Sequence, residues 1–525
     1  MAVKSIIKPS AYYDSVTLML VARELVHLPG VMDAAAVMAT EANKAVLLQA
    51  GLLTPEAQAA SPNDLVIIVS ATDETIEGAL SQAEKLLQKK QPQVVSEAPG
   101  QVFAQGYRPR TLTAAAKANP QANLALISVA GRYAADEAWE ALHRGLHVFL
   151  FSDNVSIDDE ILLKRYAAEK GLLVMGPGAG TAIINGVALG FANVVPKGTV
   201  GLVSAAGTGL QEVTSLLARH GVGITQAIGT GGRDTSQAVG GITMLMGLQA
   251  LQEDNNTEVI VLISKPAAKT VTQKVLDQVN RSQKPTVVCF LGEDARSLGV
   301  ENKNNVWAVR TLEEAALQSV AILSGKKDFD FSAEDHSEKI TELRRQLQPE
   351  QRYLRALFSG GTLCYEAQLI WRDHLKEPVL SNAPLDESNK LADSSHSQGH
   401  TAIDLGEEEF TVGRPHPMID NDLRIRRLLQ EVQQPEVGVV LLDVVLGYGA
   451  HPDPASELAE AIRKAQETTN KAGRRVIFVA SITGTDGDPQ NYSRQEQLLR
   501  DSGVILCPSN ASAARLTARI LEEYG

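Results

Sequence analysis

The amino-acid sequence predicts an α/β protein with mostly parallel sheets. Short apolar runs of strand length alternate along the chain with periodic segments of helical length, a pattern typical of strands buried between layers of helices. Loops of small residues join several of these runs directly to helices, and the second half of the chain repeats this arrangement. We therefore predict a small ferredoxin-like amino-terminal domain, a Rossmann-like half domain and two flavodoxin-like domains.

The expected domain boundaries follow changes in composition. A segment rich in Gln, Pro and Ala predicts a linker before the half domain, and a charged polar run predicts a linker helix between the two larger domains. The expected ranges are 1–100 for the amino-terminal domain, 101–122 for the linker, 123–197 for the half domain, expected to be CoA-binding-like, 198–326 for the first flavodoxin-like domain, 327–352 for the linker helix and 353–525 for the second flavodoxin-like domain.

Strands and helices are expected in each domain where apolar runs and helical periodicity alternate. In the amino-terminal domain the order strand-helix repeated three times, with a closing strand, predicts a ferredoxin-like plait. The polar segment 378–400 is expected to be a loop. The expected strands are 3–8, 31–38, 65–70, 124–129, 147–152, 172–175, 200–203, 224–228, 258–264, 285–291, 306–309, 354–359, 437–443, 476–481 and 504–508.

Two glycine-rich loops follow neighbouring strands in the first flavodoxin-like domain. Ser204 to Gly209 comes directly after one apolar run, and Gly229 to Gly232 follows the next. A helix that begins at such a loop presents unpaired backbone N–H groups and the positive end of its dipole to an anion. Both loops are expected at the ligand-binding edge of the sheet, although a tight turn between strand and helix explains either one alone.

The second flavodoxin-like domain carries a related loop. Both Gly207-Thr208 and Gly361-Thr362 precede a glutamate at the same spacing, Glu212 in the first case and Glu366 in the second. We interpret this shared Gly-Thr-x-x-x-Glu pattern as an internal duplication of one α/β arrangement.

Composition excludes several classes of protein. The formal charge is -13 over 525 residues, and no basic block offers a nucleic-acid surface. The cysteines, Cys289, Cys364 and Cys507, lie far apart, so we expect free thiols and no metal site. No long apolar segment predicts a membrane helix or a signal peptide. A cytoplasmic location is the expectation.

Longer motifs show a family resemblance. Residues 123–291 resemble the α subunit of succinyl-CoA synthetase and other NDP-forming acyl-CoA ligases, through Met175-Gly176-Pro177, both glycine loops and the strand 258–264. Residues 353–509 resemble the carboxy-terminal ligase domain of its β subunit, through the Gly361 loop and Asp404-Leu405-Gly406. With the extra amino-terminal domain and the motif from Gly413 to Asp420, the whole chain is similar to the FdrA family.

This resemblance implies a function but comes with departures from the ligase pattern. The ligases carry a phosphohistidine in a Gly-His-Ala-Gly motif, whereas the corresponding segment here, Gly292 to Ser297, contains no histidine. The chain also lacks an ATP-grasp domain and the βα turn that holds CoA in the ligases. FdrA-family chains are associated with carbamoyl transfer, as oxamate carbamoyltransferase subunits that work with a separately encoded subunit. That reaction needs a phosphate site but no phosphohistidine.

The candidate site follows from a substrate such as carbamoyl phosphate. Backbone N–H groups and hydroxyls of the loops would bind the phosphate, an arginine or lysine would neutralise its charge, and the expected phosphate-binding residues are Ser204, Ala206, Gly207, Thr208, Gly231, Gly232, Lys265, Gly360, Gly361 and Thr362. Arg233 is a candidate catalytic residue. The structural alternatives are that Ser204 and Thr208 cap a helix, that Arg233 pairs with Asp234, and that Lys265 is solvated.

A second group of candidates lies in the motif Arg414-Pro415-His416-Pro417. The two prolines fix the backbone around His416, which could polarise a carbonyl group or move a proton, and Arg414 could bind a carboxylate. Asp420 is expected to cap the next helix or orient His416. Asp443 is expected to orient a site residue or to be a buried hydrogen-bonded aspartate, and His451 to lie on the surface.

The sequence therefore predicts an enzyme, one subunit of a carbamoyltransferase that moves a carbamoyl group between phosphate and a small amide acid such as oxamate. A separately encoded partner subunit and a homo- or hetero-oligomer are expected, with carbamoyl phosphate or phosphate as ligand and CoA as a further candidate. The alternatives are an NDP-forming acyl-CoA ligase and a non-catalytic subunit that binds an anion.

Overall fold

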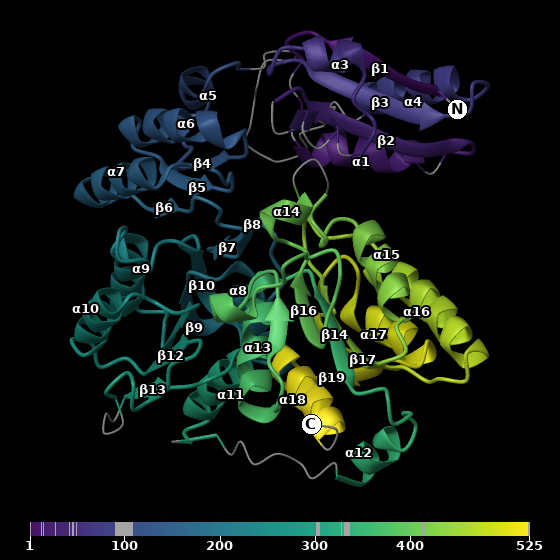
Figure 1. Ribbon diagram of the computed structural model, residues 1–525. Helices are drawn as coiled ribbons and strands as arrows, with labels where there is room; N and C mark the ends of the chain where they lie inside the picture. Colours follow the sequence, from purple (N-terminus) through teal and green to yellow (C-terminus); the bar gives the residue numbers. More distant parts are fainter. Residues whose placement is uncertain are drawn as a thin grey trace. The chain divides into compact units, whose positions relative to one another are not determined.

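The computed structural model describes residues 2–11, 13, 15–26, 28–40, 43–44, 47–48, 50–89, 109–300, 305–326, 328–329, 337–411 and 415–522. The chain forms two compact units (Figure 1). The first contains residues 1–108 and 407–416, and the second contains residues 109–406 and 417–525.

The first unit has the ferredoxin-like arrangement that the sequence predicts. Strand β3 lies between β1 and β2 and is antiparallel to both, and its central position buries residues 65–69 completely. The expected fourth strand and the expected helix 41–48 fall wholly or partly outside the described residues. The elements are β1 (Ala2–Lys8), α1 (Ser15–Val26), β2 (Val31–Met38), α3 (Pro55–Ala59), β3 (Leu65–Ala71), α4 (Ile76–Lys89) and, from the later segment, α14 (Glu408–Thr411).

The second unit begins with a three-stranded parallel sheet in the order β4-β5-β6. This is the expected Rossmann-like half domain. In two of its helices, α6 and α7, the C-cap residue is followed by a glycine with positive φ, Gly145 after α6 and Gly171 after α7. Its elements are α5 (Leu112–Ala118), β4 (Leu124–Ile127), α6 (Gly131–His143), β5 (His147–Leu150), α7 (Ile157–Glu169) and β6 (Val174–Met175).

A seven-stranded sheet follows, in the order β13-β12-β11-β9-β10-β7-β8. The hairpin β7–β8, which lies within the range expected for the half domain, pairs antiparallel with β10 and extends this sheet. The elements are β7 (Thr181–Ile184), β8 (Val187–Gly190), β9 (Lys197–Ser204), α8 (Gly207–Arg219), β10 (Ile224–Gly229), α9 (Ile242–Glu253), β11 (Val259–Ser264), α10 (Lys269–Val279), β12 (Thr286–Phe290), β13 (Val306–Ala308) and α11 (Leu312–Leu323).

The last sheet has six parallel strands in the order β15-β16-β14-β17-β18-β19. The segment 378–400, expected to be a loop, contributes the edge strand β15, which pairs with β16. The elements are α12 (Ser337–Arg344), β14 (Tyr353–Phe358), α13 (Gly361–His374), β15 (Val379–Ser381), the 3₁₀ helix η1 (Glu387–Asn389), β16 (His400–Asp404), α15 (Asp422–Glu431), β17 (Val437–Val445), α16 (Pro454–Lys471), β18 (Ile477–Thr483), α17 (Tyr492–Asp501), β19 (Ile505–Cys507) and α18 (Asn510–Leu521).

The six- and seven-stranded sheets share one hydrophobic core. Helices α8 and α11 of the first sheet pack against α13 and α18 of the second (Figure 1), and their apolar faces form a single buried cluster with strands of both sheets. Trp371 on α13 is fully buried in it, and its Nε1 donates hydrogen bonds to the Ala514 carbonyl and to Thr517 Oγ1. This packing brings the starts of α8 and α13 together. In the described part of the chain, every helix is too short or too polar to cross a membrane.

Candidate functional site

The two related loops meet at the junction of the large sheets. The Thr362 N–H donates to Thr208 Oγ1 over 3.3 Å. A Cβ atom added to Gly360 would lie 3.0 Å from Thr208 Cγ2, and one added to Gly209 would lie 3.0 Å from Thr362 Cγ2. The first turns of α8 and α13 therefore abut, and two segments that are remote in the sequence form one surface.

The first loop is shaped by its serine. Ser204 Oγ accepts from the Ala206 N–H at 3.0 Å and donates to the Ala206 carbonyl at 2.8 Å. This closes a tight turn at the end of β9 and leaves Ala206 as the N-cap of α8 without a side-chain cap. The alternative that Ser204 caps the helix directly is wrong, because its hydroxyl is used within the turn.

Backbone N–H groups at this junction are suited to bind an anion. Neither α8 nor α13 has a side-chain cap at its first residue. Within the described residues, the N–H groups of Gly207, Thr208 and Gly361 have no hydrogen-bond acceptor. Helix N-termini with free N–H groups carry partial positive charge and favour phosphate or carboxylate.

A lysine and an aspartate converge on the start of α13. A Cβ atom on Gly361 would lie 2.4 Å from Asp404 Oδ2 and 3.7 Å from Lys265 Nζ. Lys265 directly follows β11, and its Nζ lies 5.8 Å from the centre of the Tyr365 ring. Asp404 ends β16 and is almost fully buried, and its Oδ1 accepts from the Gly406 N–H at 2.9 Å. Lys265 was a predicted site residue, whereas Asp404 was not, although its position at the end of a strand before a glycine was a usable signal.

Asp443 holds the second loop in place. Its carboxylate accepts from the N–H groups of Ser359 and Gly360, each at 2.8 Å, and from Ser359 Oγ at 3.0 Å. Arg424 on α15 donates to the same carboxylate at 2.8 Å and to the Asp443 carbonyl at 2.7 Å. Burial lowers the pKa of Arg424, and the charge of Asp443 opposes that shift. The reading of Asp443 as a buried, hydrogen-bonded aspartate is confirmed, and its role as an orienter of a site residue stays a prediction.

The second glycine cluster contacts the half domain. A Cβ atom on Gly231 would lie 2.6 Å from the Pro177 carbonyl oxygen, while one on Gly232 would lie 3.9 Å from the Ala205 oxygen. Arg233 Nε donates to Glu160 Oε2 at 2.9 Å, and its NH2 donates to the Val155 carbonyl at 2.8 Å. The expected local pair with Asp234 is wrong, because Asp234 binds Lys164.

The structure describes the motif around His416 only in part. Arg414 lies outside the described residues, and His416 is half-buried in the compact unit that contains residues 1–108. Their catalytic roles stay predictions. Asp420 Oδ1 accepts from the Asp422 N–H at 2.7 Å at the first residue of α15, whereas the N-cap residue itself is Asn421, which makes no side-chain cap hydrogen bond.

His451 is not a surface residue as expected. It is 5% exposed, its Nδ1 accepts from the Asp453 N–H at 3.0 Å, and its Nε2 lies 3.1 Å from Glu457 Oε1. Its backbone N–H donates to the Met418 carbonyl and its carbonyl accepts from Gln490 Nε2, contacts that the sequence pattern gave no means to detect.

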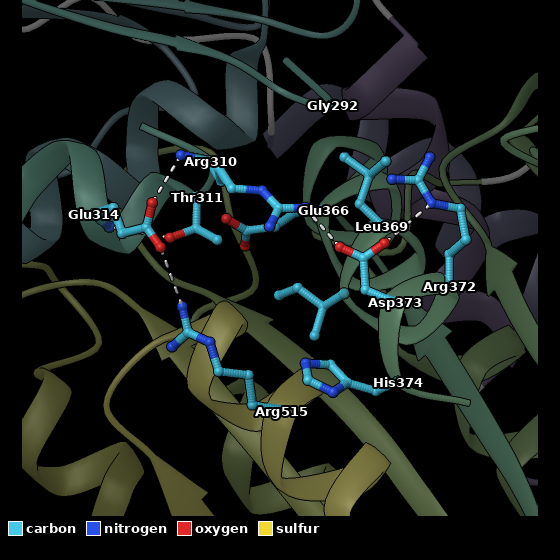
Figure 2. A pocket seen from close by; sticks show the side chains of 11 residues that line it. Gly292, Arg310, Thr311, Glu314, Glu366, Leu369, Arg372, Asp373, His374 and Arg515 are labelled. Atoms are coloured by element: carbon cyan, nitrogen blue, oxygen red, sulfur yellow. Dashed lines mark hydrogen bonds and ion pairs between the residues drawn. The ribbon is translucent and has the colours of Figure 1, made fainter. Parts of the chain in front are cut away.

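A small cavity of about 110 Å³ lies between α11, α13 and α18. Its wall includes Gly292 from the loop after β12 and the buried carboxyl of Glu366. Figure 2 shows Arg310, Arg372 and Arg515 around it, with Asp373 bound to Arg310 at 2.6 Å and to Arg372 at 3.3 Å. The loop after β12 contributes no histidine to the wall of this cavity. Nowhere in the described residues do His, Cys, Asp and Glu side chains gather into a possible metal site.

A glycine-to-alanine pair tests the junction. We expect Gly361→Ala to displace Asp404, because a contact of 2.4 Å between Cβ and Oδ2 is sterically impossible. Gly207→Ala, at the equivalent position of α8, meets nothing closer than 3.7 Å and serves as the matched control. Isothermal titration with inorganic phosphate should show at least about tenfold weaker binding for Gly361→Ala than for Gly207→Ala, which corresponds to ~1.4 kcal/mol. Equal affinities would contradict this account of the α13 terminus.

Three family models match the chain. The CoA-ligase model matches residues 357–520, the CoA binding domain model matches residues 196–292, and a model described as AllF, heavy metal-associated domain matches residues 1–101. The CoA-binding match therefore lies on the seven-stranded sheet, beyond the half domain at 123–197. Residues 1–101 contain no cysteine and a single histidine, His27, so this part of the sequence offers no thiolate ligand for a heavy metal.

The chain is also similar to several other proteins. The chain is 43% identical over 523 residues to the uncharacterized protein YahF of Escherichia coli K12, covering 99% of both chains. It is 27% identical over 184 residues to succinate–CoA ligase [ADP-forming] subunit alpha 1 of Archaeoglobus fulgidus, which is 34% of this chain and 62% of that relative. The crystal structure of PH0766 from Pyrococcus horikoshii has a TM-score of 0.33 and 16% identity, covering 76% of this chain and 84% of that chain.

The domains and their sheets define an acyl-CoA-synthetase-like protein with a succinyl-CoA-synthetase-like fold. Within this class, the identity over the full length is decisive. The chain belongs to the family of Escherichia coli YahF.

Proposed function

We propose that this protein transfers an acyl group between phosphate and an acceptor thiol, as the phosphate-using half of an acid–thiol ligase reaction. The observation that carries the proposal is the junction of α8 and α13, where two uncapped helix N-termini abut beside Lys265. In the reaction, the thiol gives up its proton to solvent and its sulfur forms a bond to the acyl carbon, the bond from that carbon to the phosphate oxygen breaks, and phosphate leaves with the electron pair. CoA is the proposed thiol because CoA-ligase and CoA-binding models match the two domains that form the junction.

The residues of the junction have separate roles in this proposal. The free N–H groups of Gly207, Thr208 and Gly361 bind the phosphate, and their fixed dipoles stabilise the charge that develops on it as it leaves. Lys265, at the end of β11 in the seven-stranded sheet, neutralises part of that charge. Asp443 and Arg424 keep the second loop rigid, so that little reorganisation is needed when the substrate binds.

A nucleotide-dependent step needs a further component. The loop after β12 offers no histidine that could carry a phosphoryl group between sites. We therefore propose that a separately encoded subunit supplies the nucleotide chemistry, or that the acyl phosphate itself is the substrate.

Carbamoyl transfer is the second candidate, and the missing histidine is the observation that favours it. Transfer from carbamoyl phosphate to a small amide acid such as oxamate uses the same phosphate site but needs no phosphohistidine. Here the acceptor nitrogen forms the bond to the carbamoyl carbon, phosphate leaves, and the nitrogen loses a proton.

One set of assays tests both candidates. The full-length protein, alone and with its genetic neighbours co-expressed, is incubated with acetyl phosphate and CoA, or with carbamoyl phosphate and oxamate. Thioester formation supports the ligase proposal, and carbamoylated oxamate supports the second candidate.

Lys265→Met should weaken phosphate binding about tenfold or more, because a charge-assisted contact is lost, whereas Lys269→Met on the exposed start of α10 should not. Neither product, together with no phosphate binding, would refute the proposed function.

A further inference from the structure

Two buried glutamates occupy the same position in the duplicated domains. Glu212 lies in α8 and Glu366 in α13, each one turn beyond the loop of the candidate site, and each is 1% exposed. Glu212 Oε1 accepts from the Asn510 N–H at 3.1 Å, and its Oε2 accepts from the Thr483 hydroxyl. Glu366 Oε1 accepts from the Leu312 N–H at 2.7 Å, and its Oε2 accepts from Asn510 Nδ2 at 2.7 Å.

These bonds cross between the domains in both directions. Leu312 begins α11, which packs on the seven-stranded sheet, and Asn510 begins α18, which packs on the six-stranded sheet. Glu212 comes from the first domain and binds the start of α18, while Glu366 comes from the second and binds the start of α11. Each carboxyl group therefore satisfies an N-terminal N–H of a helix in the other domain, where the helix dipole favours negative charge.

Asn510 joins the two halves of this exchange. Its backbone N–H binds Glu212, and its side-chain Nδ2 binds both Glu366 and the Leu363 carbonyl at 3.0 Å. Its Oδ1 is buried without a hydrogen-bond partner. Leaving a buried acceptor unsatisfied is costly, so an asparagine at position 510 lowers the stability of the folded chain.

We infer that Asn510 is a positioning residue: by binding Glu212 and Glu366 together it locks α8 beside α13 and so fixes the junction of the two loops. We call this set of bonds between Asn510, Glu212 and Glu366 the lock, and it is inferred from the geometry alone. Its consequence for phosphate binding rests on the proposed function.

The lock has a defined pH dependence. Burial raises the pKa of Glu366 to about 8, and burial also raises the pKa of Glu212. Glu212 is faced by Arg219, Tyr492 and Glu313. Glu366 is faced by Glu212, Glu313 and Cys289, and by the charged lining of the cavity in Figure 2, Arg310, Glu314, Arg372, Asp373, His374 and Arg515.

The sign follows from the raised pKa. The folded state binds the proton of Glu366 more tightly than the unfolded chain, whose ordinary value is 4.5. Stability from this group is therefore fully present below about pH 4.5 and is lost as the pH rises toward about 8.

Exchanging the acid and the amide tests the inference. At pH 9, where Glu366 is ionised, Asn510→Asp places a second carboxylate against it and removes the donor to the Leu363 carbonyl, so we expect a lower melting temperature and at least about tenfold weaker binding of inorganic phosphate at that pH. Adding Glu366→Gln to this variant restores one donor and one acceptor across the same gap, and should recover most of both losses. Asn470→Asp, on the exposed face of α16, is the charge-matched control and should change neither.

Thermal unfolding and calorimetry at pH 6 and pH 9 separate the outcomes. Wild type should lose stability between the two pH values, and Glu366→Gln alone, the variant that adds no charge, should lose less. No rescue in the double variant, or the same pH dependence in Glu366→Gln as in wild type, would overturn the lock. If wild type binds no phosphate, the proposed function fails, while rescue of the melting temperature still supports the lock.

Discussion

Replacing Lys164 by methionine should lower the free energy of unfolding of the second compact unit by about 3–5 kcal/mol. Lys164 Nζ is fully buried and donates to Glu160 Oε1 at 2.9 Å, to Asp234 Oδ1 at 2.8 Å and to the Thr230 carbonyl at 2.9 Å. Without the ammonium group, two buried carboxylates face each other with less compensation. Breaking a buried ion pair from one side is costly because the remaining charge stays desolvated.

The loss should be incomplete because each carboxylate has further partners. Asp234 still accepts from the N–H groups of Thr243 and Met244, at 3.1 and 2.8 Å, and Glu160 keeps Arg233. Chemical denaturation measures the effect. Arg165→Met, at the neighbouring exposed position of α7, is the control and should change stability by less than about 0.5 kcal/mol. Similar midpoints for both variants would show that the network does not join the half domain to the seven-stranded sheet.

Substitutions of Asp443 and of Arg424 should have the second large effect on the free energy of unfolding. We expect Asp443→Asn and Arg424→Met each to destabilise the unit by about 3–5 kcal/mol, because each leaves its partner buried and charged. Both side chains are at most 2% exposed. The double variant should be less destabilised than the sum of the single variants, with a coupling of about 0.5–3 kcal/mol. A thermodynamic cycle from denaturant titrations measures this coupling.

The two variants should differ in the candidate site. Asp443 directly binds the N–H groups of Ser359 and Gly360, whereas Arg424 acts through Asp443. Asp443→Asn should therefore weaken phosphate binding more than Arg424→Met does. Arg426→Met removes a 68% exposed arginine from the same helix and should leave both properties unchanged. Additive energies in the cycle would contradict the proposed support of the loop.

Much of the architecture could be predicted because its signals are local. The apolar run 259–264 is buried on both faces, and it reads as a continuous hydrophobic strand in the sequence. Gly145 and Gly171 mark helix ends because positive φ favours glycine. The hairpin at 181–190 was missed, and its sheet was misassigned, because strand pairing is set by contacts with β10 that no local pattern encodes.

The candidate site was predictable only in part. Gly207, Thr208, Gly361 and Thr362 carry a repeat that can be seen in the sequence. Asp404 was missed as a site residue because its role depends on an approach to Gly361 from a neighbouring strand. Arg233 was interpreted through its neighbour Asp234, whereas its actual partner, Glu160, is far away in the chain.

The sequence by itself determined most of the order of strands and helices, the duplication of the Gly-Thr loop and the absence of a histidine from the loop after β12. These features depend on residue type, periodicity and spacing along the chain. Only the tertiary structure decided that the two loops face each other, that Lys265 and Asp404 meet at Gly361, and that Asn510 connects Glu212 with Glu366. Such encounters depend on the order of strands in the sheets and on the shared helix layer, which bring together residues that no local pattern relates.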